Sequence, residues 1–238
     1  MLLKNKVTSF SCNRAFFREY GTKKYLTFAA KFSTMFLKLH SENPNPRNIK
    51  MIIECLNDGG LIIFPTDTLY SMGGSIDCPK VLDRICSLKG IKKEKANFSF
   101  IFNDLSGISE FTRPFSNDVY KMMKRNLPGA FTFILEANNN VPRIFQSKKK
   151  TIGIRIPDQP IITNIVRELG KPIMTTSITD KDDEISPFLT DPEEINELYK
   201  DKVDIIIDGG YGYNEESTIV DCTDNEIVIT RQGKGVLV

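Results

Sequence analysis

The sequence has little of what metal centres and hydrolases need. It contains one histidine, His40, and no tryptophan. Its five cysteines form no C-x-x-C pair, which favours reduced, mostly buried thiols in a cytosolic protein. A structural zinc site and a Ser-His-Asp or Cys-His hydrolase are both disfavoured, since neither can be built without clustered Cys or His. Any chemistry must rely on Lys, Arg, carboxylates, hydroxyls, backbone N–H groups or a metal bound by oxygens.

Long apolar runs are also missing. No window of 18 consecutive apolar residues occurs, so we expect no transmembrane helix and no membrane partner. The 238 residues are 40% hydrophobic, which is enough to bury one large α/β domain or two smaller ones. We therefore expect a cytoplasmic protein, whose oligomeric state the sequence does not indicate.

Charge is unevenly distributed, because the net +2 conceals a basic N-terminal segment. Residues 1–34 hold seven basic residues against Glu19 alone, whereas the remainder holds 25 basic and 29 acidic residues. The segment is either an organellar transit peptide or an extension preceding a true start at Met35, and we exclude it from the core. The mildly acidic body, residues 35–238, argues against a purely electrostatic nucleic-acid binder but leaves room for a local basic groove.

Hydrophobic periodicity predicts intermixed helices and strands. Asn45 and Pro46 are typical of a helix start, and Gly59 of a helix end. The expected helices cover residues 46–58, 80–90, 117–126, 160–170 and 191–201. The expected strands cover residues 61–64, 97–102, 130–137, 151–157, 172–177, 203–210, 217–222 and 226–233. This order predicts an α/β or α+β class, with one large mixed sheet in a single domain.

Polar residues gather at the strand ends, where open α/β sheets bind ligands. The stretch FPTDTLYSMGG, residues 64–74, follows a buried strand and is expected to be a polar loop. Thr175 and Thr176 fit strand packing and ligand binding equally well. Arg155 lies between Ile154 and Ile156 and must point to the opposite face, so it needs an anion there, either a ligand or an internal carboxylate.

Six ordered motifs resemble those of the YrdC-like family, which includes the threonylcarbamoyl-AMP synthases. FPTDTLYSMGG is similar to P-T-D-T-x-Y-G-L-G, LPGAFTFIL to P-G-P-x-T-x-x-L, and IGIRIPD to V-x-V-R-x-P. TTSIT, STIVD and ITRQG resemble the later P-x-x-x-x-S-x-N, S-T-V-V-D and L-R-x-G motifs. The resemblance runs from about Gly60 to Gly233, nearly the whole domain.

The resemblance implies a fold and a reaction. The fold would be a large twisted, mixed, open sheet with helices on one side and a concave, positively lined cleft. The reaction would join L-threonine, bicarbonate and ATP into threonylcarbamoyl-AMP and pyrophosphate, the activated precursor of the tRNA modification t6A. Mg²⁺ would accompany ATP, held mainly by the phosphates rather than by a protein metal site.

Carried over motif by motif, the resemblance implies specific site residues. Lys89 and Ser177 would be catalytic, from the K-x-R and S-x-N pairs. Asp67 is expected to be a turn and cap residue. The residues expected to bind substrate or nucleotide are Thr68, Tyr70, Thr132, Arg155, Thr179, Ser217 and Arg231.

The chain departs from the family motifs at three positions, and the first two departures make it most similar to the YciO branch. Ile91 stands where K-x-R has Arg, and Thr179 where S-x-N has Asn. Losing the guanidinium removes a charged hydrogen bond worth about 1.5–3 kcal/mol. Ser71 replaces a Gly, which predicts either about 1 kcal/mol of strain at positive φ or a changed loop path.

These departures keep a second function open. The alternative is a protein that binds double-stranded RNA, tRNA or a nucleotide without synthase turnover. Residues 148–150, all lysines, are expected to be a solvated loop or an addition to the RNA-binding patch. The other basic residues that would form that patch are Lys92, Lys93, Lys95, Lys124 and Arg125.

Overall fold

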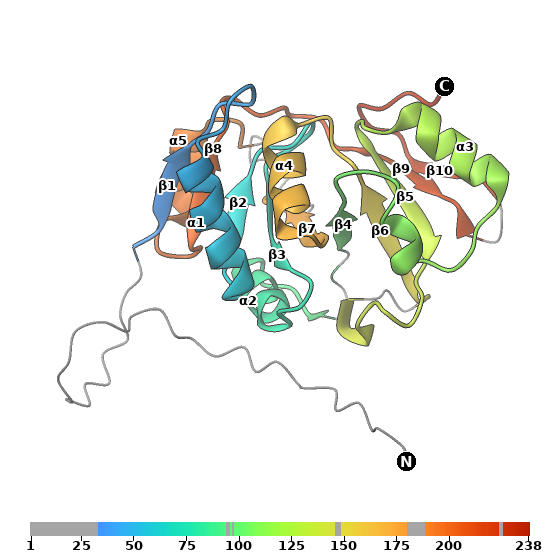
Figure 1. Ribbon diagram of the computed structural model, residues 1–238, viewed down its shortest axis with the longest axis horizontal. Helices are drawn as coiled ribbons and strands as arrows, with labels where there is room; N and C mark the ends of the chain where they lie inside the picture. Colours follow the sequence, from blue (N-terminus) through green and yellow to red (C-terminus); the bar gives the residue numbers. More distant parts are fainter. Residues whose placement is uncertain (1–32, 94–95, 97, 146–148, 180–188, 224–225) are drawn as a thin grey trace, which may run out of the picture.

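The fold is built on one mixed ten-stranded sheet, which confirms the predicted class (Figure 1). A computed structural model describes residues 33–93, 96, 98–145, 149–179, 189–223 and 226–238. The strands follow the order β1-β8-β2-β3-β7-β4-β6-β5-β9-β10. Their bounds are β1 (Met35–Lys38), β2 (Ile62–Phe64), β3 (Ser71–Ser75), β4 (Ser99–Ile101), β5 (Phe131–Glu136), β6 (Thr151–Arg155), β7 (Ile173–Ser177), β8 (Ile205–Asp208), β9 (Thr218–Asp221) and β10 (Val228–Arg231).

The helices begin where local capping signals place them. The Asn45 side chain accepts a hydrogen bond from the Arg47 N–H, and the Asp191 side chain accepts one from the Glu193 N–H. Gly170 ends its helix in the left-handed conformation at φ 71°. The bounds are α1 (Pro46–Asn57), α2 (Lys80–Leu88), α3 (Asn117–Asn126), α4 (Pro160–Leu169) and α5 (Pro192–Tyr199), with 3₁₀ turns η2 (Ile108–Glu110) and η3 (Arg143–Phe145).

The second half of the polar stretch is a strand, so the prediction of a loop there is wrong. Ser71–Ser75 forms β3, which pairs antiparallel with both β2 and β7. Ser71 does not have a positive φ, so the expected strain at this position is absent. Gly73 is required for another reason, because an added Cβ would lie 2.3 Å from the Met174 carbonyl oxygen.

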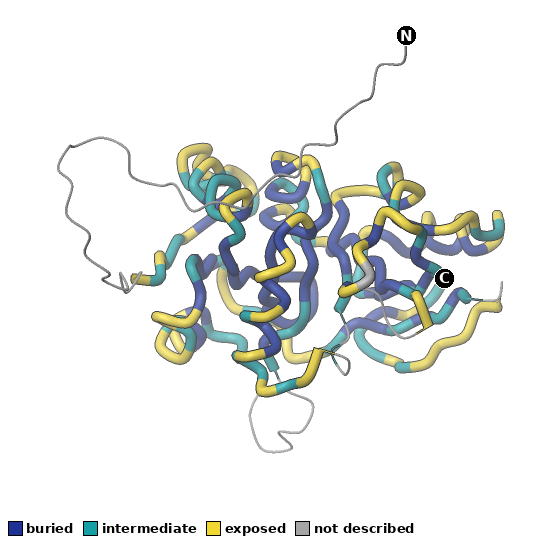
Figure 2. The backbone as a smooth tube through the Cα atoms, turned by 90° about the horizontal axis from the view of Figure 1, so that it is seen from below, coloured by how far each residue is buried: buried dark blue, intermediate teal, exposed yellow. Residues whose placement is uncertain are grey.

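Helices cover both faces of the sheet, so the expectation of helices on one side is also wrong. Ile62 and Phe64 pack in one cluster with residues of α1 and α4, which lie in front of the sheet in Figure 1. Ile63, between them, packs on the opposite face in the cluster that contains α2 and α5 residues. In Figure 2 the central strands are accordingly buried, while the exposed positions lie on the outer sides of the helices and on turns and loops.

Three further features concern the start of the domain, its cysteines and its helix lengths. β1 begins at Met35, at the predicted domain start, and residues 1–32 lie outside the described residues. The described cysteines are free thiols, and burial raises the pKa of both Cys55 and Cys222 to about 12. In the described part of the chain, no helix combines the length and hydropathy needed to cross a membrane.

Candidate functional site

The candidate site lies on the polar part of the face formed by strands β3, β7, β4 and β6, next to the part that α4 covers. Strand pairing aligns Gly73, Thr175, Ser99 and Gly153 across four neighbouring strands, and side chains at such paired positions share one face. Ile101 and Ile173 lie on the same face but pack under the α4 cluster. The open part of this face encloses a cavity of about 140 Å³. It is lined by Thr68, Leu69, Ser71, Ser99, Thr132, Arg155, Thr175, Thr176, Ser177, Glu216, Ser217, Ile219 and Arg231.

Arg155 anchors one wall of the cleft and has the internal carboxylate that the sequence left open. Its Nη2 donates to Asp67 Oδ1 at 3.1 Å and to Thr68 Oγ1 at 2.8 Å, with both charged side chains only 8% exposed. Asp67 Oδ2 also accepts from the Asp158 N–H. Burial lowers the pKa of the Arg155 guanidinium, Asp67 raises it, and the positive charge of Arg231 lowers it. Arg155 Nε is buried with no hydrogen-bond partner within the described residues.

The opposite wall is built from β5, β9 and β10. Thr132 and Ser217 share a hydrogen bond of 2.7 Å between their hydroxyl oxygens. Arg231 donates from Nε and Nη2 to the Ser217 carbonyl oxygen and forms an ion pair with Glu216 at 2.5 Å. The structure thus brings together residues from the PTDT, P-G-x-x-T, R-x-P, S-T-V-V-D and L-R-x-G motifs, as their placement at strand ends predicts.

Lys89 and Ser177 meet at the end of β7. Lys89 Nζ donates to the carbonyl oxygens of Ser177 and Thr179, each at 2.8 Å. Ser177 lines the cleft, and its hydroxyl donates to the Thr179 carbonyl oxygen. Ile91 packs against the apolar core, so the position of the missing arginine is filled by a core contact. In this structure the Lys89 ammonium therefore holds the end of β7, and Lys89 is not among the residues that line the cavity.

Tyr70 lies away from the other expected binding residues. Its side chain is fully buried in the apolar cluster, and its hydroxyl donates to the Gly210 carbonyl oxygen at 2.7 Å. Burial raises the pKa of Tyr70 to about 12. Leu69 and Ser71, on either side, line the cleft instead. Tyr70 thus holds the loop that follows β8, where Gly210 lies, and the cleft wall at this point is made by Leu69 and Ser71.

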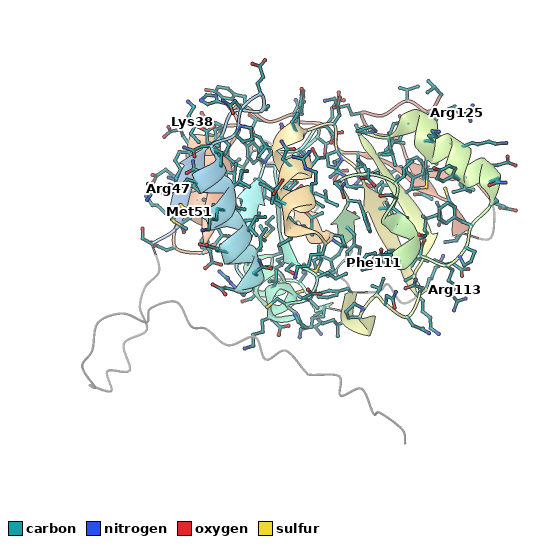
Figure 3. The ribbon with its side chains drawn as sticks, in the orientation of Figure 1. Lys38, Arg47, Met51, Phe111, Arg113 and Arg125 are labelled. Atoms are coloured by element: carbon teal, nitrogen blue, oxygen red, sulfur yellow. The ribbon has the colours of Figure 1, made fainter. Side chains whose placement is uncertain are left out.

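The basic residues expected to bind RNA do not form one patch. Lys93 pairs with Asp83 of α2, and Lys92 is exposed beside it. Lys124 and Arg125 lie in the last turn of α3, at the far end of the molecule from α2 (Figure 1), with Arg125 pointing outward (Figure 3). Lys95 and Lys148 lie outside the described residues.

Several residues in or next to the cleft were missed by the motif reasoning, although strand alternation could have found some of them. Ser99 sits between Phe98 and Phe100 in a strand, so its side chain must face away from the apolar core. Lys234 donates to the Asp67 carbonyl oxygen at 2.7 Å and lies over the Tyr213 ring. Glu216 carries no local signal, since its role depends on Arg231, which is 15 positions away in the chain.

Comparison with known proteins agrees with the motifs and the fold. A family model described as "Telomere recombination", covering Sua5, YciO and YrdC proteins, matches residues 54–233. An uncharacterized protein of Haemophilus influenzae is 39% identical, and the uncharacterized YciO of Escherichia coli 36%, each over 85% of this chain and 97% of its own. The crystal structure of E. coli YciO covers the same shares with a TM-score of 0.78.

Relatives with a named reaction are more distant. The threonylcarbamoyl-AMP synthase of Bacillus subtilis is 30% identical, over 79% of this chain and 54% of its own. The crystal structure of Pyrococcus abyssi Sua5 complexed with L-threonine matches with a TM-score of 0.76 at 24% identity, over 84% of this chain and 58% of its own. This second likeness is one of fold. The resemblance read from the six motifs is confirmed, including its similarity to YciO.

Proposed function

The chain belongs to the Sua5/YciO/YrdC family, and we propose that it binds L-threonine in the cleft and converts it, with bicarbonate and ATP, into threonylcarbamoyl-AMP and pyrophosphate. Support comes from the cleft itself. Hydroxyls and guanidiniums from separate motifs line one cavity of about 140 Å³, which suits an amino acid and is too small for a nucleotide. The relative from B. subtilis is named for this reaction, and the P. abyssi structure holds L-threonine.

In the proposed reaction the main role of the protein is to orient the substrates and to stabilise the charge that develops on them. The threonine amine takes up CO₂ from bicarbonate to form a carbamate, and a carbamate oxygen attacks the ATP α-phosphate, releasing pyrophosphate. Arg155, with a buried and unpaired Nε, would donate to the threonine carboxylate. Thr68 and Ser177 would fix the amino acid by their hydroxyls. Such transfers depend on orientation and on stabilisation of developing charge more than on covalent help from the protein.

ATP and Mg²⁺ would sit outside the enclosed cavity. The carboxylates nearest the cleft, Asp67 and Glu216, each pair with an arginine, so neither is a ready ligand for the ion. Mg²⁺ would therefore be carried by the phosphates, as is usual for this hard cation. The ammonium of Lys89 is held by two carbonyl oxygens and would have to turn from them to reach a phosphate.

An assay of pyrophosphate release tests the proposal. Purified full-length chain is incubated with ATP, Mg²⁺ and bicarbonate, with and without L-threonine, beside the B. subtilis synthase. We expect pyrophosphate release that depends on threonine, with threonylcarbamoyl-AMP as the adenylate formed. Release no greater than without threonine, while the synthase turns over, would refute the proposed reaction.

The Ile91 and Thr179 replacements predict a slow enzyme. Ile91 is engaged in core packing, and the Thr179 side chain lacks an amide. The double variant Ile91→Arg with Thr179→Asn restores both motif residues, and we expect at least about a tenfold gain in turnover, the value of one charged hydrogen bond. No gain in a folded double variant would mean that these replacements do not limit the rate.

A second candidate is RNA binding without turnover, favoured by the exposed basic turn of α3. Lys121, Lys124 and Arg125 border a shallow groove of about 780 Å³ beside the C-terminal residues. Double-stranded RNA or tRNA bound there should dissociate as salt rises, with log affinity falling linearly with log salt. Lys124→Ala with Arg125→Ala should weaken this binding, whereas Lys92→Ala, remote from α3, should not. Absence of binding at about 50 mM salt removes this candidate.

A further inference from the structure

The charges that line the cleft are balanced by residues of the chain itself. Arg155 faces Asp67 at 3.1 Å, and Arg231 faces Glu216 at 2.5 Å. Each guanidinium thus has its own carboxylate, and the cleft formed by described residues is not the positively lined surface that the resemblance implied. A site with two positive and two negative charges does not favour a simple anion.

Glu216 differs from Asp67 in being accessible. Asp67 is 8% exposed and sits behind Arg155, whereas the Glu216 side chain is 31% exposed and lines the cavity. Glu216 is also not what positions Arg231, because Arg231 Nε and Nη2 donate to the Ser217 carbonyl oxygen at 3.2 and 2.9 Å. Arg231 would therefore stay in place without the Glu216 charge, leaving its positive charge open to the cleft.

Two residues of the cavity lining, from different segments of the chain, offer different groups to a ligand. Arg155 Nε is a buried donor without a partner in the described part of the chain, suited to a carboxylate. Glu216 offers carboxylate oxygens that can accept from an ammonium. An α-amino acid carries one group of each kind within a few bonds, and its two charges match this arrangement.

We propose that Glu216 determines the ligand charge accepted by the cleft, receiving the ammonium of a zwitterionic amino acid and excluding ligands that are only anionic. This inference rests on the proposed binding of L-threonine and adds the residue that selects it. Glu216 discriminates in two ways. Its carboxylate attracts the ammonium of the ligand, and it disfavours a purely anionic ligand because it repels the anion and already neutralises Arg231. Glu216 is a specificity-determining residue, and no proton transfer is assigned to it.

The test compares two ligands that differ only in the ammonium group. L-Threonine and (R)-3-hydroxybutyrate share the carboxylate, the hydroxyl and the methyl group, and the second lacks the amine. Their affinities are measured by calorimetry on the full chain, on Glu216→Gln and on Glu215→Gln. Glu215 is the exposed neighbour of Glu216 and does not line the cleft, so its variant controls for the loss of one negative charge.

For the wild type we expect threonine to bind at least about tenfold more tightly than (R)-3-hydroxybutyrate, the value of one charged hydrogen bond. In Glu216→Gln this ratio should fall to about one, while in Glu215→Gln it should stay at the wild-type value. An unchanged ratio in Glu216→Gln, with threonine still bound, overturns the role of Glu216 and leaves the proposed function intact. If the wild type binds no threonine, both proposals fail.

A third probe tests the exclusion of anions independently of threonine. Pyrophosphate without metal should bind Glu216→Gln about tenfold more tightly than the wild type, because Arg231 is released from its ion pair but still held by Ser217. The gain should weaken as salt increases. Equal affinities in the two proteins would overturn the inference, and an equal gain in Glu215→Gln would assign the effect to overall charge instead.

Discussion

The two faces of strands β4, β5, β6 and β7 are made from neighbouring residues but do opposite things. Phe100, Phe133, Ile154 and Met174 point into the apolar cluster and are no more than 1% exposed. Ser99, Thr132, Arg155 and Thr175, one position along, line the cleft. The strand period of two lets large apolar side chains fix the sheet while small polar ones leave a hollow. Stability and ligand binding are thereby carried by separate, interleaved sets of residues.

Truncating one side chain on each face of β4 tests whether stability and ligand binding are carried by separate residues. Phe100→Ala should cost about 3–5 kcal/mol of unfolding free energy, because it leaves a cavity beside Phe145, whose ring centroid is 6.4 Å away. Ser99→Ala should cost less than about 1 kcal/mol and act instead on threonine affinity. Denaturant unfolding of both variants measures the difference. Similar costs would show that the cleft face also carries the fold.

The buried ion pair is the point where the cleft does contribute to stability. Asp67→Ala leaves the Arg155 guanidinium buried without its counter-charge, and we expect a loss of about 3 kcal/mol. Asp67→Asn should lose less, because its single amide oxygen can still accept one of the two hydrogen bonds, from Arg155 or from the Asp158 N–H. Asp158→Ala, which removes an exposed side chain next to the pair, is the control and should change stability little. Equal losses for the alanine and asparagine variants would argue that charge is not what matters.

Lys89 holds the end of β7 by hydrogen bonds to its backbone. Lys89→Ala removes two hydrogen bonds to the Ser177 and Thr179 carbonyl oxygens, and we expect a loss of about 2 kcal/mol. Under the proposed function it should also abolish pyrophosphate release. Lys92→Ala, an exposed lysine three positions on, is the matched control for both measurements. Unchanged stability would mean that these carbonyl contacts are replaced by water without cost.

The sequence predicted most of the helices and strands because their signals are local. Asn45 with Pro46, and Asp191, are caps whose effect is confined to one helical turn. Strand β3 was missed because Gly73 and Gly74 are typical of turns, and it is a strand only because β2 and β7 pair on both sides. The β7 partner comes from residues about 100 positions away and leaves no local trace in the sequence.

The motifs predicted which residues line the candidate site, but not which side chains pair with one another there. The placement of Thr132, Arg155, Ser217 and Arg231 in one cleft follows from their positions on strands of one sheet. That Arg155 meets Asp67, 88 positions away, could not be derived, since charge alone does not choose a partner. Tyr70 is buried in the core while its neighbours Leu69 and Ser71 line the cleft, so at the start of β3 a shift of one residue separates the two faces.

The smallest expected effect on stability concerns Tyr70, which lies in the apolar cluster. Tyr70→Phe keeps the buried ring and loses the hydrogen bond to the Gly210 carbonyl oxygen, which should cost about 1 kcal/mol near neutral pH. Burial raises the pKa of Tyr70 from 10.0 to about 12, so between these values the unfolded chain ionises while the folded one stays protonated. The stability due to the hydroxyl is therefore complete below pH 10 and is lost as pH rises toward 12.

The measurement is the difference in unfolding free energy between wild type and Tyr70→Phe as a function of pH, since the other titrating groups are common to both proteins. The wild-type advantage should shrink steadily as pH rises above about 10. Tyr120→Phe, which alters an exposed tyrosine on α3, should show no such trend. A constant difference for Tyr70→Phe would mean that its hydroxyl is solvated in the folded protein, and that the loop holding the first wall of the cleft opens without unfolding the sheet.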